Sequence, residues 1–364
     1  MNASARRGSL LLAGVAAVAG IAVAAAWPGA GDRYDVRRLV ADPGAAARVH
    51  DPTLVNAWGL AASPTGPWWT ANEARGTSSL YAGSGAKQAL TVRVDGGPTG
   101  IAYVDGRGFP VSDGGHTGPA RFVYASEDGK LRAWSPSVPT GWSSEAEVVV
   151  DLSGTAAVFR GLTVARQPEG RRLLYATDFH NDRVDVFDDR WRRVRLPGRF
   201  ADPRIPAWYA PFGIQAIGDR IFVTYASPAP VDGNDAPTGG YVDEFDLAGR
   251  LVSRVDALGP LNEPWGVALA PQGFGPAAGD LLVGNFGSGR IDRYRRDGAG
   301  WSFRGQLKGA GGKPIAIPGL WALRFGNGRM AGPASTLFFT AGPHRWYGSS
   351  ELQVHGLLGS IEPQ

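Results

Sequence analysis

Short apolar segments separated by turns of glycine and polar residues recur along most of this chain. The clearest stretch holds four such segments, at residues 267–270, 281–284, 291–294 and 301–307. Gly-Asp, Gly-Ser-Gly and Asp-Gly turns separate them, and turns of this kind join neighbouring antiparallel strands. The pattern therefore predicts a four-stranded antiparallel sheet in this part of the chain.

Two short motifs repeat six times at a nearly constant spacing. The first is a turn, then a small residue that is usually glycine, then an apolar strand. Its copies are Ala57-Trp58-Gly59-Leu60, Pro98-Thr99-Gly100-Ile101, Phe159-Arg160-Gly161-Leu162, Pro211-Phe212-Gly213-Ile214, Pro264-Trp265-Gly266-Val267 and Leu320-Trp321-Ala322-Leu323. The second motif is an apolar strand followed by a small residue and a turn, and its copies end at residues 72, 126, 178, 227, 285 and 342. A repeat of about 50 residues with several short strands per unit is typical of a β-propeller.

The repeats predict an all-β fold, a six-bladed β-propeller with four-stranded blades. Residues 105–119 form an insertion between the first two strands of the second unit. The sixth unit has no obvious outer strand of its own, whereas residues 34–40 alternate like a strand ahead of the first unit. We expect this N-terminal strand to pair with residues 357–361 and close the ring, because closure removes exposed sheet edges.

Composition supports a turn-rich β protein and narrows its chemistry. The 53 Gly and 27 Pro among 364 residues exclude a mainly helical chain, and 12 Trp with 15 Phe exclude a disordered one. The absence of cysteine excludes disulfides, thiolate metal sites and cysteine nucleophiles. The net charge is only +4, and the basic run at residues 190–195 is better explained as the solvated face of a strand. We therefore expect no nucleic-acid partner.

The first 26 residues have the features of an export signal. Arg6 and Arg7 precede an uncharged, Ala-rich segment, and Ala24-Ala25-Ala26 fits the small-residue rule for cleavage. An uncleaved membrane anchor is the alternative, since about 18 apolar residues nearly span a bilayer. We expect cleavage of residues 1–26, and hence a secreted, extracellular protein with no membrane contact. Residues 27–364 would then form the propeller, which we expect to be a monomer.

Residues 174–188, Leu-Tyr-Ala-Thr-Asp-Phe-His-Asn-Asp-Arg-Val-Asp-Val-Phe-Asp, resemble the NHL repeat, a propeller-blade sequence. Residues 282–291 are a weaker copy of it. With the runs Asn56-Ala57-Trp58-Gly59-Leu60, Pro264-Trp265-Gly266-Val267 and Gly319-Leu320-Trp321-Ala322-Leu323, nearly the whole mature chain is similar to a family of secreted bacterial NHL-like propellers, which are conserved hypothetical proteins. The resemblance implies the fold and brings no established reaction with it.

In a propeller, the turn leading into the innermost strand and the turn between the second and third strands open on one face, here called the loop face. Long loops at residues 227–240 and 342–348 belong to this face. Loops on a rigid scaffold commonly hold binding residues, and aromatic rings with one cation suit a ligand pocket. The candidate ligand-binding residues are Asn56, Trp58, Arg160, Phe212, Glu263, Trp265, Trp321 and His344. The ligand we expect is a small molecule, a glycan or a protein, and Arg160 favours an acidic one.

Each candidate also has a purely structural interpretation. The aromatic side chains could plug the channel and pack neighbouring blades together, and this is the interpretation we favour. Arg160 could bridge two blades through Glu263 or Asp178. For Asp178, with Asn181 and Arg183, we favour bonding to the turn backbone over binding a ligand.

Two functions of different classes remain open. The first is a non-catalytic binding or scaffold propeller without a cofactor. The alternative is a lactonase-like hydrolase or lyase with a divalent metal in the channel, for which Glu73, Asp232, Asp235 and Glu263 could offer oxygen ligands to Ca²⁺. The residues directly before the motif glycines, such as Trp58, are not oxygen ligands, so we expect no metal site. No catalytic residues are assigned.

Overall fold

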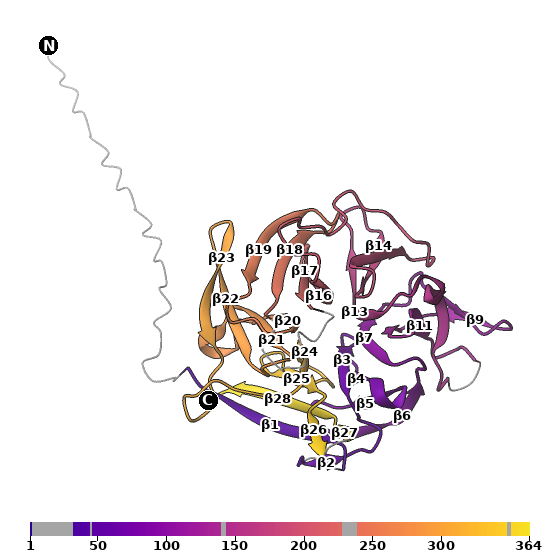
Figure 1. The fold of residues 1–364 in the computed structure, drawn as a ribbon, viewed down its shortest axis with the longest axis horizontal. Helices are drawn as coiled ribbons and strands as arrows, with labels where there is room; N and C mark the ends of the chain where they lie inside the picture. Colours follow the sequence, from indigo (N-terminus) through magenta and orange to yellow (C-terminus); the bar gives the residue numbers. More distant parts are fainter. Residues whose placement is uncertain (2–31, 44–45, 140–142, 228–238, 348–350) are drawn as a thin grey trace.

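Six sheets of mainly antiparallel strands form a ring (Figure 1), and their innermost strands line a central channel. The computed structural model describes Met1 and residues 32–43, 46–139, 143–227, 239–347 and 351–364. Within these residues the helical elements are three short 3₁₀ helices, η1 (Glu73–Arg75), η2 (Ser153–Thr155) and η3 (Gly275–Ala277). None of the helices described is long and apolar enough to cross a membrane. The prediction of an all-β, six-bladed propeller is confirmed.

Three blades have the four predicted strands in simple antiparallel order. From the channel outward, blade 1 holds β3 (Ala57–Ala62), β4 (Trp68–Asn72), β5 (Thr77–Tyr81) and β6 (Lys87–Arg93). Blade 4 holds β16 (Ala210–Ile217), β17 (Arg220–Ala226), β18 (Tyr241–Asp246) and β19 (Leu251–Ala257). Blade 5 holds β20 (Pro264–Leu269), β21 (Leu281–Asn285), β22 (Ile291–Asp297) and β23 (Gly300–Gln306).

Blade 2 has four strands and carries the predicted insertion. Its strands are β7 (Pro98–Tyr103), β10 (Phe122–Ser126), β11 (Lys130–Trp134) and β12 (Glu147–Asp151). The insertion lies between its first two strands and forms a small hairpin of β8 (Pro110–Ser112) and β9 (Thr117–Pro119).

Blade 3 departs from the prediction, because its sheet has three strands, β13 (Phe159–Arg166), β14 (Arg172–Asp178) and β15 (Arg183–Asp188). The basic run at residues 190–195, which we expected to be a strand, contributes only an isolated bridge between Arg193 and Phe187. Trp191 has a left-handed backbone with φ of 65°, which interrupts an extended chain. Pro197 follows shortly after, and proline has no N–H for a strand ladder.

Blade 6 is built from both ends of the chain. It holds β24 (Leu320–Phe325), β25 (Leu337–Ala341), β28 (Leu357–Pro363), β1 (Tyr34–Ala41) and the short β2 (Val49–His50). A second hairpin, β26 (His344–Tyr347) with β27 (Glu351–Val354), lies in the connection from β25 to β28. Strand β1 pairs with β28 from Tyr34–Pro363 to Ala41–Leu357, so the predicted closure of the ring by the N-terminal strand is confirmed.

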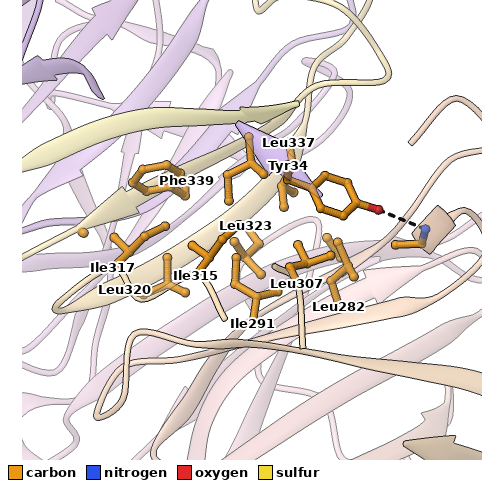
Figure 2. Packing of buried hydrophobic residues seen from close by; sticks show 14 of the residues in the cluster. Tyr34, Leu282, Ile291, Leu307, Ile315, Ile317, Leu320, Leu323, Leu337 and Phe339 are labelled. Atoms are coloured by element: carbon orange, nitrogen blue, oxygen red, sulfur yellow. Dashed lines mark hydrogen bonds between the residues drawn. The ribbon is translucent and has the colours of Figure 1, made fainter. Parts of the chain in front are cut away.

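The N-terminal strand also reaches the neighbouring blade. Figure 2 shows the Tyr34 ring beside aliphatic side chains of the core between blades 5 and 6, including Leu282 and Leu337. The Tyr34 hydroxyl accepts a hydrogen bond of 3.0 Å from Ala277 N and donates one of 3.2 Å to Phe274 O. Tyr34 therefore fixes the closing strand to blade 5 as well as to blade 6.

The motif glycines lie where the blades converge on the channel. A Cβ built on Gly266 would lie 2.4 Å from the Trp321 carbonyl oxygen of the next blade, and one on Gly213 would lie 2.1 Å from the Trp265 oxygen. Real side chains do not make such contacts with backbone, so only glycine fits at these positions. The expected placement of these glycines next to the channel is confirmed.

Candidate functional site

The aromatic candidates meet at the loop-face mouth of the channel. We call the cluster the aromatic plug; its buried members are Trp58, Phe212 and Trp321, and Trp265, Phe179 and Phe286 pack against them. Trp58 stacks on Trp321 with ring centroids 3.7 Å apart, and Phe286 stacks on Trp321 at 4.0 Å. Trp58 is only 5% exposed and Trp321 only 3%. The rings therefore pack against one another, as the structural interpretation of these residues expects.

Arg160 lies over the plug and is paired with a carboxylate. Its guanidinium carbon is 5.2 Å from the centroid of the Trp58 ring and 5.6 Å from that of Phe179, which are cation–π distances. Its Nη1 forms an ion pair with Glu127 Oε1. Burial lowers the pKa of Arg160 to about 10, and the charge of Glu73 opposes that shift.

Arg160 does not form the expected bridge to Asp178. Asp178 is fully buried and binds its own turn: its Oδ1 accepts from Val158 N and Asn181 N, and its Oδ2 lies 2.9 Å from Arg183 Nη2. These contacts agree with the backbone-bonding role that we favoured for Asp178. The bridge runs instead to Glu127, whose turn joins two strands of blade 2, so Arg160 still ties two blades together.

Asn56 connects the plug to the acidic group beside it. Asn56 Oδ1 accepts a 3.1 Å hydrogen bond from Trp321 Nε1, and Asn56 Nδ2 donates one of 2.6 Å to Glu73 Oε2. The residue has φ of 48°, a left-handed conformation that asparagine tolerates better than most residues. Asn56 therefore orients Trp321 and Glu73 rather than facing open solvent.

Three donors of this cluster have no acceptor. Trp58 Nε1, Trp265 Nε1 and Arg160 Nε are buried without a hydrogen-bond partner in the described structure. A buried donor left unpaired costs about 1–3 kcal/mol, and native proteins keep few such groups. Their concentration around one ring cluster distinguishes the plug from an ordinary aromatic core.

Two other candidates, Glu263 and His344, belong to the same face. Glu263 has a left-handed backbone with φ of 51°; its N–H donates to Gly239 O and its carbonyl accepts from Phe286 N. His344 begins β26, and its side chain lies outside the described residues. Residues 228–238, which include the expected Ca²⁺ ligands Asp232 and Asp235, also lie outside them. In the part of the chain that is described, no three His, Asp or Glu side chains group as a metal site would require.

The opposite end of the channel holds a cation that the sequence did not indicate. A pocket of about 230 Å³ there is lined by Arg324, Gln215, Thr163 and Asn327, among others. Arg324 Nε donates to Leu60 O at 3.2 Å, and burial alone lowers the pKa of Arg324 to about 10. Gln215 Oε1 is buried without a donor. Arg324 directly follows the sixth motif, and no repeated pattern marks it.

Two curated proteins match most of the chain. It is 32% identical over 345 residues to Uncharacterized protein R648 of Acanthamoeba polyphaga mimivirus, across 90% of this chain and 80% of R648. It is 30% identical over 303 residues to Uncharacterized protein L690 of the same virus, across 80% of this chain and 78% of L690. The chain belongs to the family of R648. These relatives are viral, whereas the sequence resemblance pointed to a bacterial family. No family model matches the chain.

Two solved structures with a similar fold are named as enzymes. A luciferin-regenerating enzyme aligns over 85% of this chain and 92% of its own, with a TM-score of 0.51 and 14% identity. A glucose dehydrogenase aligns over 90% of this chain and 99% of its own, with a TM-score of 0.51 and 13% identity. At this level of identity the likeness shows the propeller fold alone.

Proposed function

We propose that this protein is an exported, monomeric, NHL-like propeller that binds a small organic acid or an acidic glycan without catalysis. The proposed site is the loop-face mouth of the channel, around Arg160. One observation carries the proposal: Trp58 Nε1, Trp265 Nε1 and Arg160 Nε are buried donors without acceptors in the described structure. A ligand that carries acceptor oxygens would satisfy them.

The chemistry of the site favours an acidic group. Glu127 holds Nη1 of Arg160, which leaves the Nε edge of the guanidinium for a carboxylate or sulfate, the partners that this planar fork binds best. The indole rings add stacking area and two neutral donors. Trp265 is only partly buried, so a rotation of this ring is the simplest way for a ligand to reach the donors.

Binding measured on an array of acidic glycans and small organic acids, with calorimetry on the ligands retained, tests this proposal. We expect Trp58→Phe, which removes an unpartnered donor and keeps a ring, to weaken binding about tenfold or more. Arg160→Met should do the same by removing the cation. Trp134→Phe is the matched control. The Trp134 indole lies outside the plug, and its Nε1 donates a 2.9 Å hydrogen bond to Ser143 O. Wild-type protein that retains no acidic ligand would overturn the proposal.

A metal-dependent hydrolase or lyase is the second candidate. It is supported by the fold shared with enzymes and by the carboxylates Glu73 and Glu263 on the loop face. Elemental analysis of the purified mature protein separates the two functions. One bound divalent ion per chain, lost in Glu73→Gln, would favour the enzyme; binding of acids that chelator treatment leaves unchanged would favour the binding protein.

Export is the remaining part of the proposal. The mature N-terminus should lie near Trp27, as measured by mass spectrometry of the protein released from a secreting host. A protein that keeps Arg6 and Arg7 and stays with the membrane fraction would instead support an uncleaved anchor.

A further inference from the structure

A second cavity lies beside blade 6, apart from the aromatic plug. It has a volume of about 560 Å³ and is enclosed by the segment 309–318 on one side and by β1, β25 and β28 on the other. Neither the motif aromatic residues nor Arg160 line it. A volume of this size is within the range of small-molecule sites.

The walls of the cavity are mostly apolar and well supported. Ile315, Ile317, Phe339 and Leu357 line it, and Figure 2 shows Ile317 opposite Phe339 at the edge of the core between blades 5 and 6. The segment is held by two backbone hydrogen bonds of 2.9 Å, from Ile315 N to Leu307 O and from Ile317 N to Gly289 O. This wall is therefore a fixed surface on which an apolar ligand body could pack.

One histidine on the lining has an unpartnered nitrogen. His355 is 7% exposed, and its Nδ1 lies 2.8 Å from Asp42 Oδ2. Asp42 Oδ1 accepts from Gly356 N at 3.1 Å, so the carboxylate is fixed and holds the imidazole in one orientation. His355 Nε2 is buried and has no hydrogen-bond partner in the described structure. A buried ring nitrogen of this kind calls for a polar ligand atom.

The rim of the cavity is positively charged. Arg38 and Lys313 line it and are exposed. Neither has a carboxylate within ion-pair distance among the described residues, and Asp42 faces His355 instead. Two unpaired cations beside an apolar cavity favour a ligand that carries one negative charge on an apolar body.

We propose that this cavity binds an amphipathic carboxylic acid. The apolar body packs on Ile317, Phe339 and Leu357, and the carboxyl group meets His355 Nε2 with Lys313 and Arg38 at the rim. If the imidazole is neutral, Nε2 accepts from the acid; if it is protonated, Nε2–H donates to the carboxylate. The site is independent of the plug, and its ligand needs no aromatic or glycan character.

Titration calorimetry of the full mature chain with decanoate, and with decanamide as the uncharged analogue, tests this site. Decanoate should bind about tenfold more tightly than decanamide. Lys313→Gln should weaken decanoate binding about threefold to tenfold, whereas Lys308→Gln, just before this segment and outside the cavity, should not. Ala316→Trp should abolish binding by filling the cavity from an exposed position that leaves the core intact.

Three results would overturn the proposal. The first is equal affinity for the acid and the amide, or no binding of either. The second is a dissociation constant that neither Lys313→Gln nor Ala316→Trp changes. The third is loss of decanoate binding in Trp58→Phe, which would place the acid at the plug and support the proposed function instead of this second site.

Discussion

Each end of the central channel holds a partly buried arginine, and the two arginines differ in their partners. At the loop-face end, six aromatic rings close the channel and Arg160 pairs with Glu127. At the opposite end, Arg324 lines a pocket of about 230 Å³ and donates a hydrogen bond to the neutral Leu60 carbonyl. Burial lowers the pKa of each arginine to about 10, so both stay cationic at neutral pH. The Arg160 charge is paired with a carboxylate, whereas Arg324 has no carboxylate within ion-pair distance among the described residues to offset its desolvation.

Substitution of a motif glycine between the two channel ends should give the largest loss of stability. Gly266→Val should destabilise the fold by about 3 kcal/mol, because the added Cβ would meet the Trp321 carbonyl oxygen at 2.4 Å. Chemical denaturation measures the change. Gly154→Ala is the control, since a Cβ there meets nothing within 4 Å. A Gly266→Val protein as stable as the control would mean that the blades do not converge tightly between the two channel ends.

Substitution of two tryptophans of the plug distinguishes the contribution of ring packing from that of hydrogen bonding. Trp321→Phe and Trp58→Phe remove similar volume, but only Trp321 donates to an acceptor, Asn56 Oδ1. We expect Trp321→Phe to cost about 1–2 kcal/mol more than Trp58→Phe, because it leaves a buried oxygen without a donor. Denaturant midpoints measured in parallel give the difference. Equal midpoints would indicate that Trp58 Nε1 is paired in solution, which would remove the main support for the ligand site.

The features that could be predicted from the sequence are those that repeat once in each blade. Six lead-in turns repeat, with a glycine in five of them and an aromatic residue before the small residue in four, so the ring and most of the plug follow from one pattern. The closing strand was predictable because residues 34–40 alternate as a strand does. The absence of a fourth strand in blade 3 was not predictable. The basic run with Trp191 and Val194 between its arginines resembles a strand in sequence, and only the structure shows the left-handed backbone at Trp191 that interrupts it.

The groups that give each site its chemistry meet only in the folded chain. Asp42 and His355 are 313 residues apart, and Arg160 meets Glu127 across a blade boundary. Nothing in the neighbouring sequence of any of these residues marks its partner. Arg324 is a similar case, because an arginine in a strand is usually taken for an outward-facing residue.

The smallest effects come from the two arginines themselves, and only the loss of Arg160 should destabilise the protein. Arg160→Met removes the cation above Trp58 and leaves Glu127 without its ion pair. Since both partners are partly exposed, we expect a loss of about 1 kcal/mol. Arg324→Met removes a desolvated charge and one hydrogen bond to a carbonyl that is left facing the pocket. Relief of desolvation should balance or exceed the lost bond, so stability should stay the same or rise by up to about 1 kcal/mol.

Chemical denaturation of Arg160→Met, Arg324→Met and the double variant tests whether only the loss of Arg160 destabilises the protein. The arginines lie at different ends of the channel, so their effects should add. If Arg324→Met destabilised the protein as much as Arg160→Met, the Arg324 charge would have a compensating partner in solution. A bound anion in the 230 Å³ pocket would be one such partner, and it would show itself as a salt-dependent stability that Arg324→Met abolishes and Arg160→Met does not.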